Sequence, residues 1–519
     1  MADNVALAAA ARRAEQVIPL FILEDAWRTD PEVGAARLAF LLQSVACLRE
    51  RLATLGYSLV IRRGDSRELL PQLCAEFGAQ AVFANKGYEP YVQRRDEQIT
   101  AALLRAGRGF ELFKDAVVCE EREVLTQAGN PFTVFTPYSR AWKSRPLPAP
   151  VPGLLAHSGP VQSFKSDPLP ASLEELGLGS APGAIFCAPA ENSGRTDKSL
   201  ARLDVERAES RARGRNQPRP GRACSPTQDF GLTQTIPAAG ETAALELLQR
   251  FMAEPVYAYA DTRDFPARAG TSGLSPHLHA GTIGIRTILA ALARARARAT
   301  TPAQAGGCDV FLNELIWREF YQQVLVNFPH VTTGAFRPEY DRLAWSDNRE
   351  HFAAWCAGRT GYPIVDAAMR CLNATGTMPN RLRMVVAMFL TKDLLIHWQW
   401  GERYFMQQLV DGDLAANNGG WQWSAGTGTD AAPYFRIFNP VSQGEKFDPA
   451  GGYVRRWVPE LADFPDDLIH QPWENPLRCA RAKYPERMVL HAEQRVKCLA
   501  MFKAVKPGIR PAAGAFALQ

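Results

Sequence analysis

The segment DGDLAANNGGWQW, residues 411–423, places two acidic residues, a tandem Asn pair and two indoles within thirteen positions. Asp and Asn lower helix propensity and Gly419-Gly420 interrupts a helix, so a turn that leads into Trp421 is predicted. Fixed hydrogen-bonding groups beside large π faces suit a planar, polar heterocycle better than aliphatic packing does. We therefore interpret the segment as one wall of a cofactor site. The alternative is a polar turn followed by two buried Trp.

Length and composition indicate a globular chain of several domains. Of its 519 residues, 46% are apolar and 22% charged, and single cores stop growing near about 250–300 residues. No apolar run approaches the ~18 residues of a membrane span, and no secretory signal begins the chain, so a cytoplasmic protein is predicted. The ten cysteines form no C-x-x-C pair, so we expect no disulfide framework and no metal site. The net charge of +5 permits an anionic partner without requiring one.

The first 145 residues alternate between short apolar runs and helical patterns. Runs typical of strands cover residues 17–23, 57–62, 79–84 and 110–118. Between them, apolar residues recur at i, i+3 and i+4, as helices require. This β-α-β-α order predicts an α/β domain at 1–145, with a parallel sheet covered by helices on both faces. No G-x-G-x-x-G is present, so a dinucleotide fingerprint is not indicated.

The rest of the chain divides into a connector and a helical region. Residues 146–240 are loop-like, and 195–222 hold eight Arg, which indicates a low-complexity insert. That insert is either a solvated loop or an electrostatic arm for nucleic acid. Helical periods dominate 241–505, which predicts an all-α domain, and a short tail follows at 506–519. Eight of the eleven Trp lie between positions 317 and 457, a concentration that suggests a role beyond packing.

Two polar segments of the helical region are ambiguous when taken alone. Residues 271–275 (TSGLS) precede a helix whose N-cap is predicted to be Ser275, with Pro276 at its first position. The free N–H groups there would form either an anion cradle or an ordinary cap. Residues 427–430 (TGTD) lead towards Arg436, and this approach is either a phosphate contact or a simple loop.

Two helical segments also carry paired polar groups. Four side chains at i, i+3, i+4 and i+7 share one helix face: Glu314, Trp317, Arg318 and Tyr321. This face holds a flat polar ligand, or it consists of a core Trp beside a Glu314–Arg318 salt bridge. Arg381 and Arg383 open another helix, and either could pair with Asp411 or reach a phosphate.

Together these segments closely resemble the photolyase/cryptochrome flavoproteins, in particular class I cyclobutane pyrimidine dimer photolyases. The similar stretches are TSGLS (271–275), NELIWREFY (313–321), GYPIVDAAMR (361–370), NRLRM (380–384), GERYFMQQLVDGDLAANNGGWQW (401–423) and TGTDAAPYFRIFNP (427–440). The resemblance spans nearly the whole chain. It implies a Rossmann-like antenna domain, a long connector, and a helical domain that holds FAD beside a cavity facing DNA.

The resemblance also implies roles for individual residues. The implied FAD-binding residues are Tyr259, Thr271, Ser272, Gly273, Leu274, Ser275, Arg318, Arg383, Asp411, Asp413 and Asn417. The implied electron-transfer chain is Trp345, Trp398 and Trp421. The implied lesion pocket is Glu314, Trp317, Asn380, Met384 and Trp423, and the implied DNA-phosphate contacts are Arg263, Arg381 and Arg436. Asn417 would face flavin N5, where a neutral amide tolerates the anionic reduced flavin.

The implied activity is light-dependent repair of cyclobutane pyrimidine dimers, a carbon-carbon lyase reaction on UV-damaged DNA. A dimer inside a duplex has to be flipped out, and its damaged stacking lowers that cost. Trp317 and Trp423 would pack against the dimer while Glu314 stabilises charge developing on its carbonyl. One electron would pass from photoexcited reduced FAD to the lesion and return. We also expect a monomer, and an antenna chromophore that is methenyltetrahydrofolate or a deazaflavin.

Three features depart from the family pattern. Residues 3–7 (DNVAL) stand at the beginning without the strand that precedes them in the family, which predicts a misassigned start codon or truncated gene and impaired antenna binding. Residues 376–380 read GTMPN where the family usually has GWMHN, so we expect weaker flavin or lesion binding. The insert at about 180–228 is foreign to most relatives.

The main alternative is a cryptochrome-like blue-light photoreceptor without repair activity. The short tail and the intact set Glu314, Trp317 and Trp423 favour repair. A (6-4) photolyase would place a His where Pro379 stands, and a flavin reductase would need a nicotinamide fingerprint.

Overall fold

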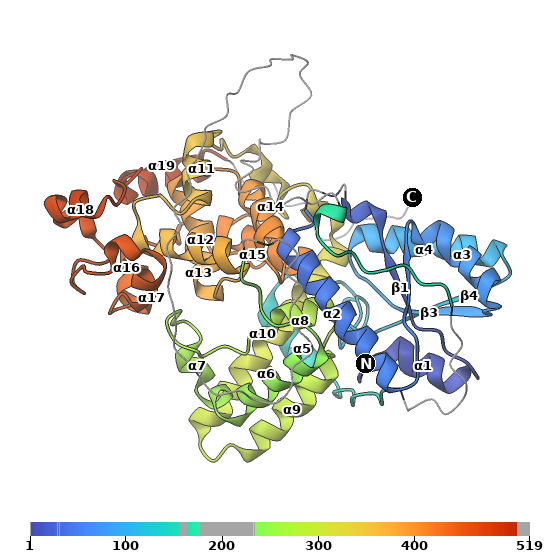
Figure 1. Cartoon of the computed structure of the whole chain (residues 1–519). Coiled ribbons are helices and arrows are strands. Elements are labelled where there is room, and N and C mark those ends of the chain that lie inside the picture. The colour runs from blue at the N-terminus through green and yellow to red at the C-terminus, as the bar shows by residue number, and fades with distance from the viewer. Residues whose placement is uncertain are drawn as a thin grey trace.

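The computed structural model describes residues 2–28, 30, 32–154, 164–176, 232 and 234–505. An α/β part and a larger helical part lie side by side, and α2 and α8 lie where the two parts meet (Figure 1). The predicted insert at 180–228 and the tail at 506–519 fall outside the described residues. No helix within the described ranges is long and apolar enough to span a membrane.

The α/β part contains four short parallel strands. β1 (Leu20–Leu23) pairs with β2 (Val60–Arg63), and β3 (Ala81–Asn85) pairs with β4 (Gly109–Phe113). The parallel direction confirms the prediction. Within the described residues these strands form two separate two-stranded parallel sheets.

The observed strands are shorter than the predicted runs, and the run at 110–118 shows why. β4 ends at Phe113. Val118 is buried in the core cluster of the helical part instead, and the Glu319 carboxylate accepts the Val118 N–H at 2.6 Å. A tertiary hydrogen bond has therefore replaced continued sheet pairing.

Helices cover both faces of these strands, as predicted. They are α1 (Val5–Arg13), α2 (Ala35–Thr54), α3 (Ser66–Phe77) and α4 (Pro90–Arg105), whereas α5 (Phe135–Lys143) packs against α10 of the helical part. The pleat of β1 sends alternate side chains to the two faces. Leu20 and Ile22 pack with α3 and α4, whereas Phe21 packs with α2.

From residue 241 the described chain is helical, as predicted. Its α-helices are α6 (Glu241–Ala253), α7 (Tyr259–Thr262), α8 (Ser275–Ala280), α9 (Ile285–Arg298), α10 (Pro302–Asn327), α11 (Arg349–Cys356), α12 (Pro363–Thr375), α13 (Asn380–Met388), α14 (Trp398–Gln408), α15 (Leu414–Ala425), α16 (Pro440–Phe447), α17 (Gly452–Trp457), α18 (Pro476–Ala482) and α19 (His491–Ala504). The helical pattern at 381–398 is interrupted, because α13 passes into a π-helical turn at Phe389–Asp393 and Leu395 takes a positive φ of 55°.

The long helix α10 joins the two parts of the molecule. Glu319, only 2% exposed, accepts hydrogen bonds from Val118 N, Cys119 N and Trp142 Nε1 at 2.6–2.8 Å. All three donors belong to the α/β part. Glu319 is therefore a buried clamp, and burial raises its pKa.

The prediction of a turn in residues 411–423 is wrong. Residues 414–425 form α15, not a turn, and only the first three residues of the quoted stretch precede the helix. Asp413 caps it, since its Oδ1 accepts the Ala416 N–H at 2.9 Å. Gly419 fits because a Cβ there would lie 2.1 Å from Cδ1 of Tyr321. Tertiary packing thus overrides the low helix propensity of this sequence.

The two adjacent glycines of α15 should respond oppositely to the same substitution. Gly419→Ala should lower the free energy of unfolding by roughly 1–3 kcal/mol, because the added methyl meets the Tyr321 ring. Gly420→Ala should raise it by up to about 1 kcal/mol, since a Cβ there meets nothing within 4 Å and Ala favours helix. Urea unfolding of both variants measures the difference. Equal effects would show that α15 does not pack tightly on α10.

Candidate active site

The predicted site residues lie mainly on four helices that contact one another. α15 packs against α10, α13 and α14. Small residues make these contacts close: a Cβ at Gly401 of α14 would lie 2.0 Å from Cη2 of Trp421. The site is therefore set on a rigid helical frame.

Arg383 and Asp411 form the first polar pair of the site. Arg383 Nη2 donates to both Asp411 oxygens at 2.9 and 2.8 Å, and its Nε donates to Met378 O at 2.9 Å. The Asp411 side chain is 7% exposed and that of Arg383 is 29% exposed. Of the pairings left open by the sequence, the structure selects Arg383 with Asp411.

Asp413 lies at the N-terminus of α15 beside groups that keep it ionised. Burial would raise its pKa, but His279, whose Nδ1 is 4.0 Å from Asp413 Oδ2, and the charge of Arg318 hold the pKa at about 2. Gln322 Nε2 also donates to Asp413 Oδ2 at 3.1 Å. This carboxylate is a fixed negative charge at neutral pH.

Asn417 and Asn418 are anchored by α14. Asn417 Nδ2 donates to the Glu402 carbonyl at 2.9 Å, and Asn418 Nδ2 donates to Glu402 Oε1 at 2.8 Å. Burial raises the pKa of Glu402 from 4.5 to about 8. Glu402 is therefore largely protonated at pH 7, so its carboxyl group places no full negative charge behind Asn417.

Glu402 should make the stability of the protein fall as pH rises. Between its ordinary pKa of 4.5 and its folded value of about 8, the unfolded state loses a proton that the folded state keeps. This contributes a loss of about 1.4 kcal/mol per pH unit over that window. Glu402→Gln should remove this contribution to the pH dependence of stability, because Gln has nearly the size and shape of Glu but does not titrate. Urea unfolding at pH 5.5 and 7.5 tests this; an identical pH dependence in both proteins would contradict it.

Glu314 pairs with Arg263 rather than with Arg318. Arg263 Nη1 donates to Glu314 Oε1, and the Arg263 guanidinium lies 5.3 Å from the Tyr259 ring centre. Arg318 instead donates to Ala116 O at 2.7 Å, across the boundary between the two parts. The simple surface pair offered as an alternative is therefore absent from the described structure, and Glu314 faces a cation on α7's C-terminal side.

The other predicted DNA contacts differ in exposure. Arg381 Nη2 binds Asp264 Oδ2 at 2.6 Å and lies 4.4 Å from the Phe447 ring centre. Arg436 is exposed and follows Pro433 in a turn. Arg263 and Arg381 both lie beside the Asp264 carboxylate, since Arg263 Nε is 3.8 Å from Asp264 Oδ1.

The aromatic part of the predicted lesion pocket reaches the α/β part. Trp317 stacks on Phe135 of α5 with ring centres 3.7 Å apart and planes at 5°. Trp423 and Met384 are half-buried, and Asn380 is exposed. Pro379 caps α13, and its carbonyl accepts from Leu382 N and Arg383 N. Pro379, which stands where the family usually has His, therefore caps the helix that carries Arg383.

Residues 271–275 form a loop that ends one residue earlier than predicted. Leu274, not Ser275, is the N-cap of α8, because the Leu274 carbonyl accepts the Leu278 N–H at 2.9 Å. Gly273 has a φ of 67°, a conformation that favours glycine. Thr271, Gly273 and Ser275 are exposed, Ser272 is half-buried, and Tyr259 is buried nearby in the core.

The three predicted electron-transfer tryptophans run from the core outward. Trp421 and Trp398 are 2% and 1% exposed, whereas Trp345 is half-buried. His397 lies between Trp345 and Trp398, with ring centres at 5.5 and 5.7 Å. Trp421 packs against Gly401, one turn beyond Trp398 on α14. This series from buried to half-buried rings is the arrangement that an electron-transfer relay needs. The same arrangement is also found in ordinary aromatic core packing.

Three residues at the site were not predicted from the sequence. Phe135 stacks on Trp317, and His279 lies beside Asp413. The ring centres of Trp355 and Trp421 are 6.0 Å apart. Each is remote in sequence from its partner, so spacing carried no signal. His279 alone could have been noticed, because it follows TSGLS by one helical turn.

The polar groups fit a ring system such as the isoalloxazine of FAD. Asp411, Arg383 and Asn417 offer an acceptor, a cation and a neutral amide on adjoining helices. Gln322 Oε1 and the Trp421 indole N–H are buried without a hydrogen-bond partner in the described structure. A Cβ at Gly420 would meet nothing within 4 Å. FAD would supply redox and light-absorbing chemistry there, held by these residues.

Known proteins match both parts of this arrangement. A family described as "DNA photolyase" matches residues 1–154, and one described as "FAD binding domain of DNA photolyase" matches residues 311–504. A deoxyribodipyrimidine photo-lyase of Synechococcus sp. is 38% identical over 98% of this chain and 95% of its own length.

Solved structures agree with these sequence matches. A class III photolyase from Agrobacterium tumefaciens has a TM-score of 0.79 at 35% identity and covers 97% of this chain and 95% of its own. A Synechocystis cryptochrome has a TM-score of 0.77 at 23% identity, covering 96% of each chain, which shows the shared fold alone. On these matches, and on the polar set around Asp411, the chain belongs to the DNA photolyase family of FAD-binding proteins.

Proposed function

We infer that the protein is a deoxyribodipyrimidine photo-lyase that repairs cyclobutane pyrimidine dimers in DNA under light, with reduced FAD as its cofactor. The observation that carries this inference is that two groups of predicted site residues lie on helices that contact each other. Arg383, Asp411 and Asn417 form a flavin-type polar set, and Glu314 and Trp317 on α10 form a polar and aromatic face. Similarity to deoxyribodipyrimidine photo-lyases over nearly the full chain supports the same activity.

The polar set favours a flavin that carries negative charge in its working state. The Asp411 carboxylate is neutralised by Arg383, and Glu402 behind Asn417 is largely protonated. A neutral amide and an ion pair without net charge raise no electrostatic barrier to an anionic ring. We assign flavin N5 to Asn417 on this argument, and phosphate contacts to the loop 271–275.

The face with Glu314 suits a pyrimidine dimer that has been flipped out of the duplex. Trp317 is stacked on Phe135 on one ring face, and the rest of its half-buried surface would pack against the lesion, while Glu314 is held in place by Arg263. We assign Glu314, Trp317, Asn380, Met384 and Trp423 to the lesion, and Arg263, Arg381 and Arg436 to DNA phosphates. We expect the protein to act as a cytoplasmic monomer, which sedimentation with and without DNA would test.

Light dependence is the direct test of the proposed activity. The protein with fully reduced FAD is mixed with DNA that contains thymine dimers and kept dark or under blue light. Dimers should disappear only in the light. Equal loss in darkness, or no loss under light with reduced FAD bound, would overturn the proposed function, and light-induced signalling without repair would favour the cryptochrome alternative.

Glu314→Ala should lower the repair yield per absorbed photon more than it weakens DNA binding. A group that acts on charge developing in the lesion affects the chemical step, and removing such a group from an enzyme typically costs about 10²–10³-fold. We expect a loss of at least about twofold in yield. Quantum yield and the dissociation constant for damaged DNA are measured together.

Arg263→Ala is the matched control for Glu314, since it removes the other half of the same ion pair. It should weaken DNA binding and lower the slope of the salt dependence by about one phosphate contact, and it should reduce the yield less than Glu314→Ala does, because the Glu314 carboxylate remains. If Glu314→Ala instead lost affinity and kept its yield, Glu314 would belong to recognition.

A further inference from the structure

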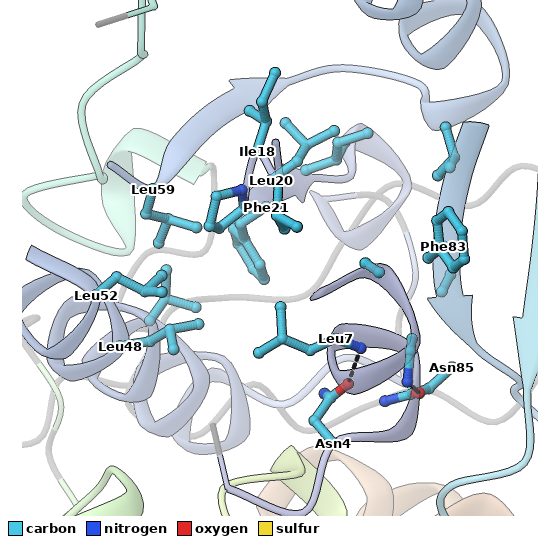
Figure 2. Close-up of a pocket in the computed structure, with 18 of the residues that line it drawn as sticks. Asn4, Leu7, Ile18, Leu20, Phe21, Leu48, Leu52, Leu59, Phe83 and Asn85 are labelled. Atoms are coloured by element: carbon cyan, nitrogen blue, oxygen red, sulfur yellow. Dashed lines mark hydrogen bonds between the residues drawn. The ribbon is translucent and has the colours of Figure 1, made fainter. Parts of the chain in front are cut away.

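One segment of the α/β part packs against the helical part, beside three residues assigned to the lesion: Glu314, Trp317 and Trp423, which we call the lesion face. The pocket shown in Figure 2 lies inside the α/β part, between β1 and β3, and residues 132–135 do not line it. This segment leads into α5, and its two Phe side chains pack in the core cluster of the helical part. Of the two, Phe135 stacks on Trp317.

The Phe135 ring covers one face of the Trp317 indole. The ring centres are 3.7 Å apart and the planes are 5° from parallel. Carbon atoms in contact lie about 3.5–4.0 Å apart, so the two rings touch face to face. On α10 itself, Phe320 and Tyr321 lie beside the indole, with ring centres 5.6 and 5.4 Å away. An indole packed in this way cannot turn about χ2 without leaving the Phe135 ring.

The loop of residues 427–430 holds the Phe135 segment in place. Asp430 Oδ2 accepts the Phe135 N–H at 3.0 Å, and Thr429 Oγ1 donates to the Thr133 carbonyl at 2.5 Å. Phe135 is the first residue of α5, and the N-cap residue of this helix makes no side-chain hydrogen bond. Asp430 therefore caps α5 from a segment 295 positions away in the chain, and a carboxylate suits a helix N-terminus.

Asp430 occupies a backbone conformation that needs support. Its φ is 44°, in the left-handed region that residues other than glycine adopt uncommonly. Such a conformation persists where surrounding contacts over-determine it, and it clusters at functional sites. Here the contacts are the hydrogen bond from Phe135 N and the burial of the neighbouring Thr429, which is 6% exposed. The position of the carboxylate is therefore set by the fold of the loop.

The same loop is also anchored to Trp423. The Trp423 carbonyl accepts the N–H groups of Gly426 and Ala432, both at 3.2 Å. The chain therefore leaves α15, forms the loop and returns to the same carbonyl. One loop thus connects the backbone of Trp423 with the residue that covers Trp317.

These contacts decide between the two interpretations that the sequence left open for residues 427–430. A phosphate contact is disfavoured, because the Asp430 carboxylate repels phosphate and the hydroxyl-bearing residues Thr427 and Thr429 are 0% and 6% exposed. A simple loop is disfavoured by the two side-chain hydrogen bonds to a distant segment. The loop is a connection between the two parts of the molecule, placed beside the lesion face.

We propose that Asp430 and Phe135 are positioning residues for the lesion face: through them the loop 427–430 fixes the orientation of Trp317 relative to Trp423 before DNA binds. Neither positioning residue needs to touch the lesion. The proposal rests on the proposed function, since the lesion face belongs to it. It gives the α/β part a role at the lesion face that does not depend on an antenna chromophore.

A pre-oriented Trp317 should matter most for damaged DNA. A dimer that leaves the duplex loses its stacking and pairing, and the protein recovers part of that loss through contacts with the flipped-out bases. A side chain that must first be ordered recovers less, because ordering costs conformational entropy. Undamaged DNA is bound mainly through its phosphates, so its binding does not depend on an indole. Loosening Trp317 should therefore lower the preference for damaged DNA.

The test measures dissociation constants in the dark for a duplex with one thymine dimer and for the same duplex without it. Asp430→Gly removes the carboxylate but tolerates the positive φ, and Phe135→Leu removes the stacked ring. Each should lower the preference for the dimer by at least about fivefold, the lower end of what one stack between an aromatic side chain and a base contributes. Because both constants come from one protein sample, a smaller folded fraction alone leaves their ratio unchanged.

Three control variants separate positioning from other effects. Asp430→Asn keeps an acceptor oxygen and tolerates the left-handed backbone but removes the charge, so it should keep most of the preference. Phe135→Tyr keeps the stacked ring and should do the same. Phe132→Leu removes a Phe of the same segment whose ring lies beside Tyr138, with centres 6.1 Å apart, and it should leave the preference unchanged.

The outcomes distinguish this proposal from the proposed function. If the wild-type protein does not prefer the dimer, the proposed function fails and this proposal fails with it. If the wild type does prefer the dimer, and Asp430→Gly and Phe135→Leu keep that preference, this proposal alone is overturned. Equal losses in Asp430→Asn and Asp430→Gly, or in Phe132→Leu and Phe135→Leu, would also overturn it, because charge or general packing would then explain the effect. Should Asp430→Gly not fold, Phe135→Leu and Phe135→Tyr give the same comparison.

Discussion

Trp345→Phe should block light-driven reduction of oxidised FAD by an external donor while leaving repair from chemically reduced FAD intact. Trp345 is the half-buried member of the series, and His397 connects it to the fully buried Trp398. A phenyl ring conserves most of the volume but is much harder to oxidise than an indole. We expect photoreduction to slow by at least about tenfold, equivalent to about 1.4 kcal/mol of barrier. Flavin absorption under blue light with a thiol donor measures the rate.

Trp457→Phe provides a matched control. Trp457 is also half-buried at the edge of the same core cluster, and its aromatic contact is with Tyr453, 6.4 Å away. It should lose similar packing without affecting photoreduction. If both variants reduce FAD at the wild-type rate, Trp345 is not an obligatory relay. The concentration of Trp in this domain would then reflect core packing.

The features that sequence predicted well are those with local signatures. The strand-helix alternation, the parallel strand direction and the change to helices after residue 241 follow from apolar spacing and from connection length. The membership of the family follows from contiguous motifs such as 411–423. In each case one segment of chain contains the whole signal.

The features that sequence missed depend on contacts between distant segments. α15 forms despite its tandem Asn and Gly because Tyr321 packs on Gly419, a residue 98 positions away in the chain. Arg263 rather than Arg318 pairs with Glu314 because the loop after α7 brings it close. The division of the sheet into halves is likewise a matter of pairing, and no periodicity reports it.

Arg286→Ala should be among the most destabilising single substitutions at the boundary between the two parts. Arg286 is 4% exposed, and its Nε donates to Asp3 Oδ1 at 2.7 Å while its Nη2 pairs with Asp115 Oδ1 at 2.5 Å. Removing the cation leaves the buried Asp3 carboxylate and the partly buried Asp115 carboxylate without their shared partner. Breaking such a buried network typically costs about 3–5 kcal/mol. Urea unfolding at pH 7 measures the loss.

Arg296→Ala on the same helix separates burial from the loss of an arginine. Arg296 pairs with Asp309 at 2.6 Å, but their side chains are 55% and 43% exposed. Water and salt replace such a pair readily, so a loss of only about 0–1 kcal/mol is expected. Adding Asp3→Asn to Arg286→Ala should recover part of the lost stability, because one buried charge is removed with its partner. Equal losses for the two arginines, or no recovery in the double variant, would mean that the Asp3–Arg286–Asp115 network is hydrated and does not hold the two parts together.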